Sequence, residues 1–165
     1  MATIDQFKAN LIGGGPRANR FRVFVPRAGQ RLEFLCTATK IPESTINTIS
    51  VPFRGQNLKL AGDRTFADWS ITVINDLDFS TRTALEAWSN DIASLSTTEA
   101  ATDTDYLLSR AFVEQLHKDD SVLARYEFFN MFPTSIGEIA LSSAEASEVE
   151  TFEAGFTYSH WERVL

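Results

Sequence analysis

The chain has 165 residues, of which 44% are hydrophobic and 22% charged, as is typical of one globular domain spanning residues 1–165. Its formal net charge of −7 argues against a surface that holds DNA or RNA through phosphate contacts. The single cysteine, Cys36, excludes an intrachain disulfide and a cysteine-based zinc site. No apolar run approaches the roughly 18 residues of a membrane helix and no secretory signal begins the chain, so we expect a soluble, cytoplasmically made protein without a membrane anchor.

Residues 1–18 predict a short helix followed by a hinge. Ile4, Phe7 and Leu11 fall at helical spacing, and the run GGGP at residues 13–16 ends the pattern. A phosphate-binding loop would need a preceding strand and a following Lys-Ser or Lys-Thr pair, and the sequence has neither.

Two hairpins are predicted next. Alternating residues at 21–25 and 32–38 flank a turn at residues 27–29 and predict a first hairpin. Residues 46–51 and 57–60 flank a turn centred on Gly55 and predict a second, protruding hairpin over residues 45–61.

A strand and an amphipathic helix follow. Over residues 66–74, Trp69, Ile71 and Val73 alternate with the face of Ser70, Thr72 and Ile74, which predicts a strand with one strongly apolar face. Residues 80–95 predict the helix, with Ser80 as its N-cap. Its apolar stripe comprises Ala84, Leu85, Trp88, Ile92 and Leu95.

The C-terminal part reads as a loop and three strands. Residues 96–105 predict a loop, residues 111–117 and 122–131 a hairpin that Pro133 ends, and residues 149–161 one last long strand. With seven or eight antiparallel strands, we expect a mainly β fold. The expected architecture is an antiparallel β-barrel or sandwich of two packed sheets, with one flanking amphipathic α-helix and a protruding β-hairpin.

The sequence shows no pattern of an active or metal site. His117 and His160 lack spaced carboxylate or thiol partners, and no GxSxG turn is present. The acidic residues Glu145, Glu148, Glu150 and Glu153 could supply a general acid and base, but a charge run is usually a solvated surface. We therefore expect no enzymatic activity, no cofactor and no metal.

Several segments carry a resemblance to a known family. In chain order these are FLCTATKIP, AGDRTFADWSITVIND, LEAW within the helix, FPTSIGEIAL and EVETFEAGFTYSHWE. Between about residues 19 and 162 the chain resembles the tail tube protein of contractile-tailed, myovirus-type bacteriophages; the first 18 residues and the loop at 96–105 match no family pattern.

The resemblance implies a structural virion protein. Such subunits form rings of six copies that stack into a hollow tail tube inside a contractile sheath, and DNA passes through the bore during ejection without specific binding. The implied partners are the sheath, baseplate, tape-measure and tail terminator proteins, and assembly takes place in the host cytoplasm.

Three sets of residues are candidates for assembly. The apolar residues of the protruding hairpin are too many for a free arm, so we expect them to bury against an adjacent subunit and to support stacking: Ile46, Ile49, Val51, Phe53, Leu58 and Leu60. We expect Asp63, Arg64 and Asp68 to make polar contacts at a subunit boundary. The candidate lumen face is small and polar: Ser70, Thr72, Thr151, Glu153, Thr157 and Ser159.

Two other functions remain open. The first is the inner tube of a contractile injection system that delivers protein cargo. The second is a small β-barrel binding or enzymatic module, which would need polar groups that converge on a concave wall.

Overall fold

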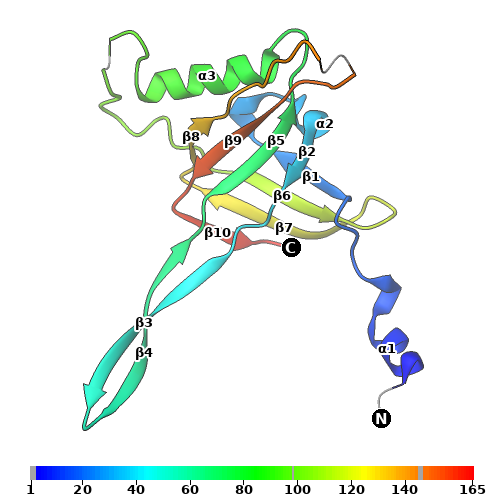
Figure 1. The fold of residues 1–165 in the computed structure, drawn as a ribbon, viewed down its shortest axis with the longest axis vertical. Coiled ribbons are helices and arrows are strands. Elements are labelled where there is room, and N and C mark those ends of the chain that lie inside the picture. Colours follow the sequence, from blue (N-terminus) through cyan, green and yellow to red (C-terminus); the bar gives the residue numbers. More distant parts are fainter. Residues whose placement is uncertain (1–2, 98, 145–146) are drawn as a thin grey trace.

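The computed structural model describes residues 3–97, 99–144 and 147–165, which form two four-stranded antiparallel sheets and a separate two-stranded hairpin (Figure 1). The first sheet has the order β1 (Phe21–Phe24), β6 (Ala111–Leu116), β7 (Val122–Phe129), β10 (His160–Arg163). The second has the order β2 (Cys36–Thr39), β5 (Trp69–Ile74), β9 (Thr151–Thr157), β8 (Phe132–Ile136). The hairpin pairs β3 (Ser44–Phe53) with β4 (Gln56–Phe66).

The helical elements are short except for one. They are α1 (Ile4–Asn10), the 3-10 turns η1 (Ile12–Gly14) and η2 (Pro26–Ala28), α2 (Leu32–Leu35) and α3 (Ser80–Ile92). None of the helices within the described ranges has the length and apolar character needed to cross a membrane. The mainly β, antiparallel fold class expected from the sequence is confirmed as a two-sheet sandwich.

The two sheets share one core. In β5, Trp69, Ile71 and Val73 are buried while the residues between them are partly exposed, which confirms the predicted alternation. The Trp69 ring stacks on Phe128 of the opposite sheet with ring centroids 4.5 Å apart. Since full burial of one large apolar side chain contributes about 1.5–3 kcal/mol, these inward faces hold the sandwich together.

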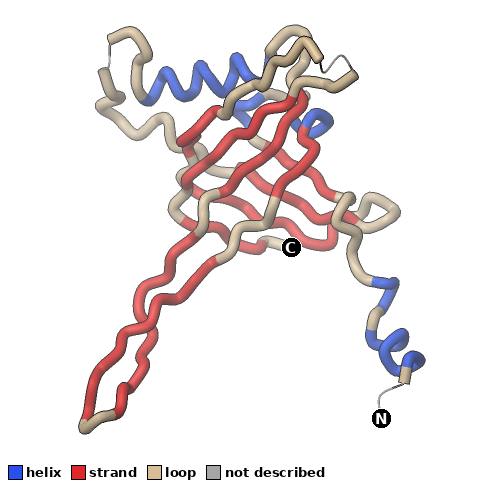
Figure 2. Tube along the Cα trace, in the orientation of Figure 1, coloured by secondary structure: helices blue, strands red, loops and turns tan. Residues whose placement is uncertain are grey.

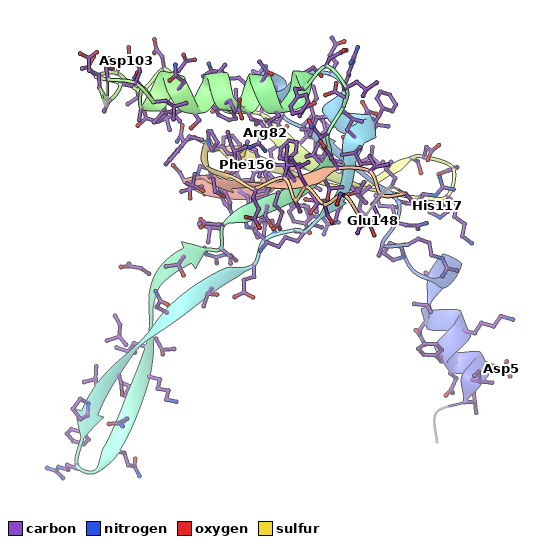
Figure 3. The ribbon with its side chains drawn as sticks, turned by 45° about the horizontal axis from the view of Figure 1, so that its top comes forward. Asp5, Arg82, Asp103, His117, Glu148 and Phe156 are labelled. Atoms are coloured by element: carbon purple, nitrogen blue, oxygen red, sulfur yellow. The ribbon has the colours of Figure 1, made fainter. Side chains whose placement is uncertain are left out.

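Helix α3 lies across one end of the sandwich (Figure 1, top). Its Leu85 and Trp88 side chains are fully buried, and the Trp88 indole donates a hydrogen bond to the carbonyl oxygen of Tyr106 at 2.8 Å. Arg82 reaches from the helix toward the second sheet and donates to the carbonyl oxygen of Gly137 at 2.9 Å (Figure 3). The predicted apolar stripe therefore does dock the helix on the core.

The helix begins at Ser80 as predicted, but its predicted N-cap and its predicted end are wrong. Phe79, with φ 52°, occupies the N-cap position, and the Asp76 carboxylate accepts hydrogen bonds from the Ser80 backbone nitrogen and hydroxyl. The side chain of Asp76 thus does the capping that the sequence assigned to Ser80. At the other end the helix stops at Ile92, and Leu95 is 84% exposed.

The first predicted hairpin, residues 21–38, is also wrong. β1 pairs with β6 and β2 pairs with β5, so these two strands lie in different sheets. Between them, residues 32–35 form the one-turn helix α2, in which Leu32 is buried and Phe34 is 81% exposed. Leu32 and Leu35 fit one helical face, whereas Leu32, Phe34 and Cys36 fit a strand alternation, so the short run did not distinguish helix from strand.

The last predicted strand, residues 149–161, is two strands. β9 ends at Thr157 and pairs within the second sheet, whereas β10 begins at His160 and pairs with β7 in the first. The chain crosses between the sheets at Tyr158 and Ser159.

Pro133 does not end the pairing as predicted. It is buried within β8, opposite Phe156. β8 is an edge strand, where a residue without an N–H is tolerated. The hairpins predicted over residues 45–61 and 111–131 are confirmed as β3–β4 and β6–β7.

Candidate assembly surfaces

The hairpin β3–β4 projects from the sandwich as a two-stranded ribbon (Figures 1 and 2). Its register pairs Ile49 with Leu60, Val51 with Leu58 and Phe53 with Gln56, and directly paired residues point to the same face. The intervening pairs, Ser50 with Lys59 and Pro52 with Asn57, belong to the opposite face. Five of the six predicted hairpin residues therefore form one apolar face: Ile49, Val51, Phe53, Leu58 and Leu60.

This apolar face is bare. The exposed fractions of its five residues run from 42% for Val51 to 68% for Phe53. A two-stranded hairpin is at best marginally stable alone in water, so a ribbon with such a face is expected to be covered in the working protein.

Ile46 differs from the other five. β4 contains one extra residue in the bulge opposite Ile46 and Thr48, and Ile46 pairs with Arg64 beyond it. Ile46 is three positions from Ile49 along β3, so the strand alternation puts it on the other face of the ribbon. Its half-exposed side chain does not extend the apolar face.

The base of the hairpin is tied to the core from both strands. On the β3 side, the Trp69 indole donates to the carbonyl oxygen of Lys40 and to the hydroxyl of Thr39, both at 3.0 Å. On the β4 side, the Tyr158 hydroxyl donates to the carbonyl oxygen of Ala67 at 2.5 Å. The Ala67 nitrogen in turn donates to the carbonyl oxygen of Glu43 at 3.1 Å, which joins the two strands at their root.

Tyr158 keeps its proton at this position. Burial, with a smaller contribution from the charge of Asp68, raises the pKa of Tyr158 to about 12. The phenol therefore remains a hydrogen-bond donor over the whole physiological pH range.

The three predicted boundary residues are exposed but do not form one cluster. Arg64 donates to the hydroxyl of Ser44 at 3.2 Å across the ribbon. Asp68 accepts from the hydroxyl of Thr157 at 2.9 Å at the hairpin base. Asp63 has no hydrogen bond or ion pair with the described residues, so its carboxylate is open to another chain.

Most of the candidate lumen residues do share a surface. Register pairs Thr72 with Glu153, and Ser70 lies on the same outer face of the second sheet. Alternation along β9 places Thr151 and Thr157 on this outer face as well. Ser159 lies beyond the strand, at the crossing between the sheets. The outer face of the second sheet is thus lined mainly by small hydroxyl side chains, with one carboxylate and the apolar Ile74 beside Thr151.

Sequence reasoning missed a buried charge cluster on the outer side of the first sheet. Glu114 is fully buried and accepts a hydrogen bond from Arg125 Nε at 2.6 Å, while Arg22 Nη1 lies 3.5 Å from its second oxygen. The Arg125 guanidinium also lies over the Phe112 ring at 4.5 Å. The sequence did contain an indication of this cluster, because Glu114 stands inside the otherwise mostly apolar strand AFVEQL.

A second missed surface is the helix α1. It contains no buried residue, and Ile4 and Phe7 are 81% and 64% exposed. The sequence showed the helical spacing of Ile4, Phe7 and Leu11. It did not show whether this apolar stripe packs against another part of the same chain.

The acidic residues considered for catalysis are dispersed. Glu150 accepts from the Asn75 side chain at 3.1 Å, Glu148 is exposed and Glu153 lies on the second sheet, while Glu145 is outside the described residues. Within the described part of the chain, no three His, Cys, Asp or Glu residues are grouped to hold a metal ion. Burial raises the pKa of the Cys36 thiol to about 11, which keeps it neutral.

A β-sandwich that holds an apolar hairpin face and an apolar helix stripe in solvent is typical of a structural subunit that assembles with other chains. The phage tail tube protein family matches residues 10–164. The chain belongs to that family, which confirms the resemblance seen in the sequence.

Individual relatives are consistent with this family assignment. The chain is 31% identical to the tail tube protein gp19 of Enterobacteria phage T4 over 159 residues, covering 96% of this chain and 98% of the relative. The fold is similar to a chain of the PVC sheath–tube complex, an extracellular contractile injection system (TM-score 0.67, 15% identity, 99% and 98% coverage). It is also similar to a chain of the anti-feeding prophage baseplate (TM-score 0.66, 10% identity, 91% and 95% coverage).

Proposed function

We propose that this protein polymerises as stacked rings of six copies into the inner tube of a contractile phage tail, a component of the virion. The observation that carries the proposal is the bare apolar face of the projecting hairpin β3–β4. Family membership supports the tube, and the six-fold symmetry of the anti-feeding prophage baseplate, with its similarly folded chain, supports the ring size.

Ring closure uses the free edges of the second sheet. Its edges are β2 and β8, and the alternating strand directions across four strands make these two antiparallel. The edge β2 of one copy can therefore continue the ladder onto β8 of the next, and closure around the ring removes both exposed edges of the second sheet.

Stacking uses the hairpin. Full burial of one apolar side chain is worth about 1.5–3 kcal/mol, and roughly half of each of the five side chains is still exposed. Covering the face with neighbouring subunits would thus contribute on the order of 5 kcal/mol per subunit before ordering costs.

The outer face of the second sheet lines the bore. Ser70, Thr72 and Glu153 offer hydroxyls and negative charge, and no lysine or arginine belongs to the strands β5 and β9. A cationic wall would hold phosphates through counterion release, whereas this lining lets DNA slide past without specific binding.

The sheath, baseplate, tape-measure and tail terminator proteins are the proposed partners. Structural similarity to a chain of the PVC sheath–tube complex supports contact with a sheath. That similarity also favours the alternative of a tube that carries protein cargo. The 31% identity with the T4 tail tube protein favours the phage tail.

Electron microscopy of the concentrated protein tests the proposal. We expect hollow tubes with six-fold end views from the full chain, with or without a baseplate seed. A variant that lacks residues 48–57 should remain folded by circular dichroism and form no stacks. Full-length protein that stays monomeric under seeding, or normal tubes from the deletion variant, would overturn the proposal.

A further inference from the structure

The helix α1 lacks the tertiary packing that normally stabilises so short an element. It has seven residues, and helices shorter than about 12 residues are marginal in water without packing. Yet its start is well formed: the Thr3 hydroxyl accepts from the Gln6 nitrogen and the Gln6 side chain accepts from the Thr3 nitrogen. A capped helix with a bare stripe of Ile4, Phe7 and Leu11 is prepared to pack on another surface.

The same chain carries a second bare surface, the apolar face of the hairpin. The two are not in contact with each other. In Figures 1 and 3 the hairpin and α1 leave the same end of the sandwich but on opposite sides of it. The hairpin slants toward the side of β8, and α1 hangs below the side of β2 (Figure 1).

This placement matters in a ring. When the β2 edge of one copy pairs with the β8 edge of the next, α1 of the first copy lies on the same side as the hairpin of the second copy. Resting on the ring proposed above, we propose that α1 packs its Ile4, Phe7 and Leu11 stripe on the apolar hairpin face of the neighbouring copy in the same ring.

The two surfaces match in length. The stripe from Ile4 to Leu11 covers seven helical steps, about 10 Å at 1.5 Å per residue. The hairpin face from Ile49 to Phe53 covers four strand steps, about 13 Å at 3.3 Å per residue. One helix therefore covers most of the face, and the tip at Phe53 stays free for the next ring.

A glycine hinge lets α1 reach its partner. Gly13, Gly14 and Gly15 have φ values of 68°, 77° and 75°, a region in which other residues are strained. Beyond the hinge the chain is held again, because the Gln115 side chain donates to the carbonyl oxygen of Arg17 at 2.7 Å. The helix can thus turn about residues 13–15 while the sandwich stays fixed.

Disulfide trapping in assembled tubes tests the contact. In a Cys36→Ala background, Phe7→Cys is combined with Val51→Cys, and the tubes are oxidised and run on a non-reducing gel. We expect a ladder of covalent multimers that stops at six copies. The matched control combines Phe7→Cys with Ser50→Cys on the polar face of the same ribbon, and should give no ladder.

The outcomes separate this inference from the proposed function. Absence of tubes would overturn the tube itself. Tubes without a ladder, an equal ladder from the control pair, or a ladder that continues past six copies would overturn the α1 contact and leave the tube standing.

A double-mutant cycle gives a second measurement that needs no cross-link. Phe7→Ala and Leu58→Ala should each raise the critical concentration for tube formation about tenfold, because each removes apolar area that the contact would bury. Because the two side chains share one contact, the double variant should raise it by much less than the product of the two effects. A full product would contradict the contact.

Discussion

The hydroxyl of Tyr158 lies 2.5 Å from the carbonyl oxygen of Ala67 and donates a hydrogen bond to it. Tyr158 lies where the chain crosses from the second sheet to the first, and Ala67 lies where the hairpin returns to the sandwich. One bond therefore connects the root of the projecting hairpin to the point that joins the two sheets.

Replacing Tyr158 by Phe should loosen the hairpin root. Removal of the donor leaves the Ala67 carbonyl without this partner, at a cost of about 1–2 kcal/mol in the free energy of unfolding. Urea denaturation measures the loss, and hydrogen exchange should quicken at the amides of β3 and β4. As a control, Tyr126→Phe removes a hydroxyl that has no hydrogen bond with the described residues; equal effects of both changes would refute the link.

The same tyrosine predicts a change in stability at high pH. Its folded pKa of about 12 lies above the value of about 10 in an unfolded chain, so the unfolded state loses the proton first. The stabilisation is complete below pH 10 and is lost as the pH rises from about 10 to 12. Urea midpoints at pH 8, 10 and 11 should converge for wild type and Tyr158→Phe, and parallel curves would contradict the assignment.

The charge cluster around Glu114 predicts that removing its arginine costs more stability than removing its carboxylate. Arg125→Met leaves the fully buried Glu114 carboxylate with only the Arg22 ion pair at 3.5 Å, which should cost about 3 kcal/mol. Glu114→Gln leaves arginines whose side chains already reach solvent, and should cost only about 1 kcal/mol. Chemical denaturation of both variants checks the order, and Arg20→Met, which breaks an exposed pair with Asp120, is the control. A larger loss from Glu114→Gln would contradict this account.

The two faces of the hairpin should respond differently to charge. Val51→Asp places a carboxylate on the apolar face and should abolish tubes while the thermal midpoint of the subunit changes little, since Val51 is 42% exposed. Ser50→Asp, one residue away on the polar face, should leave tube formation intact. Tube yield by sedimentation reports both, and equal behaviour would count against an amphipathic ribbon.

The open carboxylate of Asp63 predicts a boundary effect. Asp63→Lys should leave subunit stability unchanged, because Asp63 has no hydrogen bond or ion pair with the described residues, and should reduce tube yield and length if its carboxylate contacts another chain as predicted. Glu99→Lys reverses another exposed carboxylate, far along the chain from the hairpin, and serves as the comparison. Tubes of normal length and yield from Asp63→Lys would remove this residue from the assembly surface.

Local patterns predicted the local elements. The alternation of Trp69, Ile71 and Val73 reported a strand with one buried face, and the stripe through Leu85 and Trp88 reported the docked helix. Hairpins joined by short turns were also readable, because their partners are neighbours in sequence.

Non-local features were not readable in the same way. Alternation at residues 21–25 indicates a strand but not its partner, and the partner proved to be β6, about 90 residues away by sequence numbering. The pattern from Phe152 through Tyr158 continues smoothly across the crossing, so nothing in it marked the change of sheet. The bulge in β4 opposite Ile46 and Thr48 is likewise a matter of pairing and not of residue type, whereas the spacing of three from Ile49 already places Ile46 on the other face of β3.

Hairpin and N-terminal helix leave the sandwich at one end, while α3 caps the other (Figure 1). A filament made from such subunits has a direction: one terminus displays protruding appendages and the opposite terminus displays the receiving surfaces. The two termini are chemically unlike, so they should elongate at unequal speeds and suit different terminal proteins. The direction of the whole filament therefore follows from the asymmetry of a single subunit.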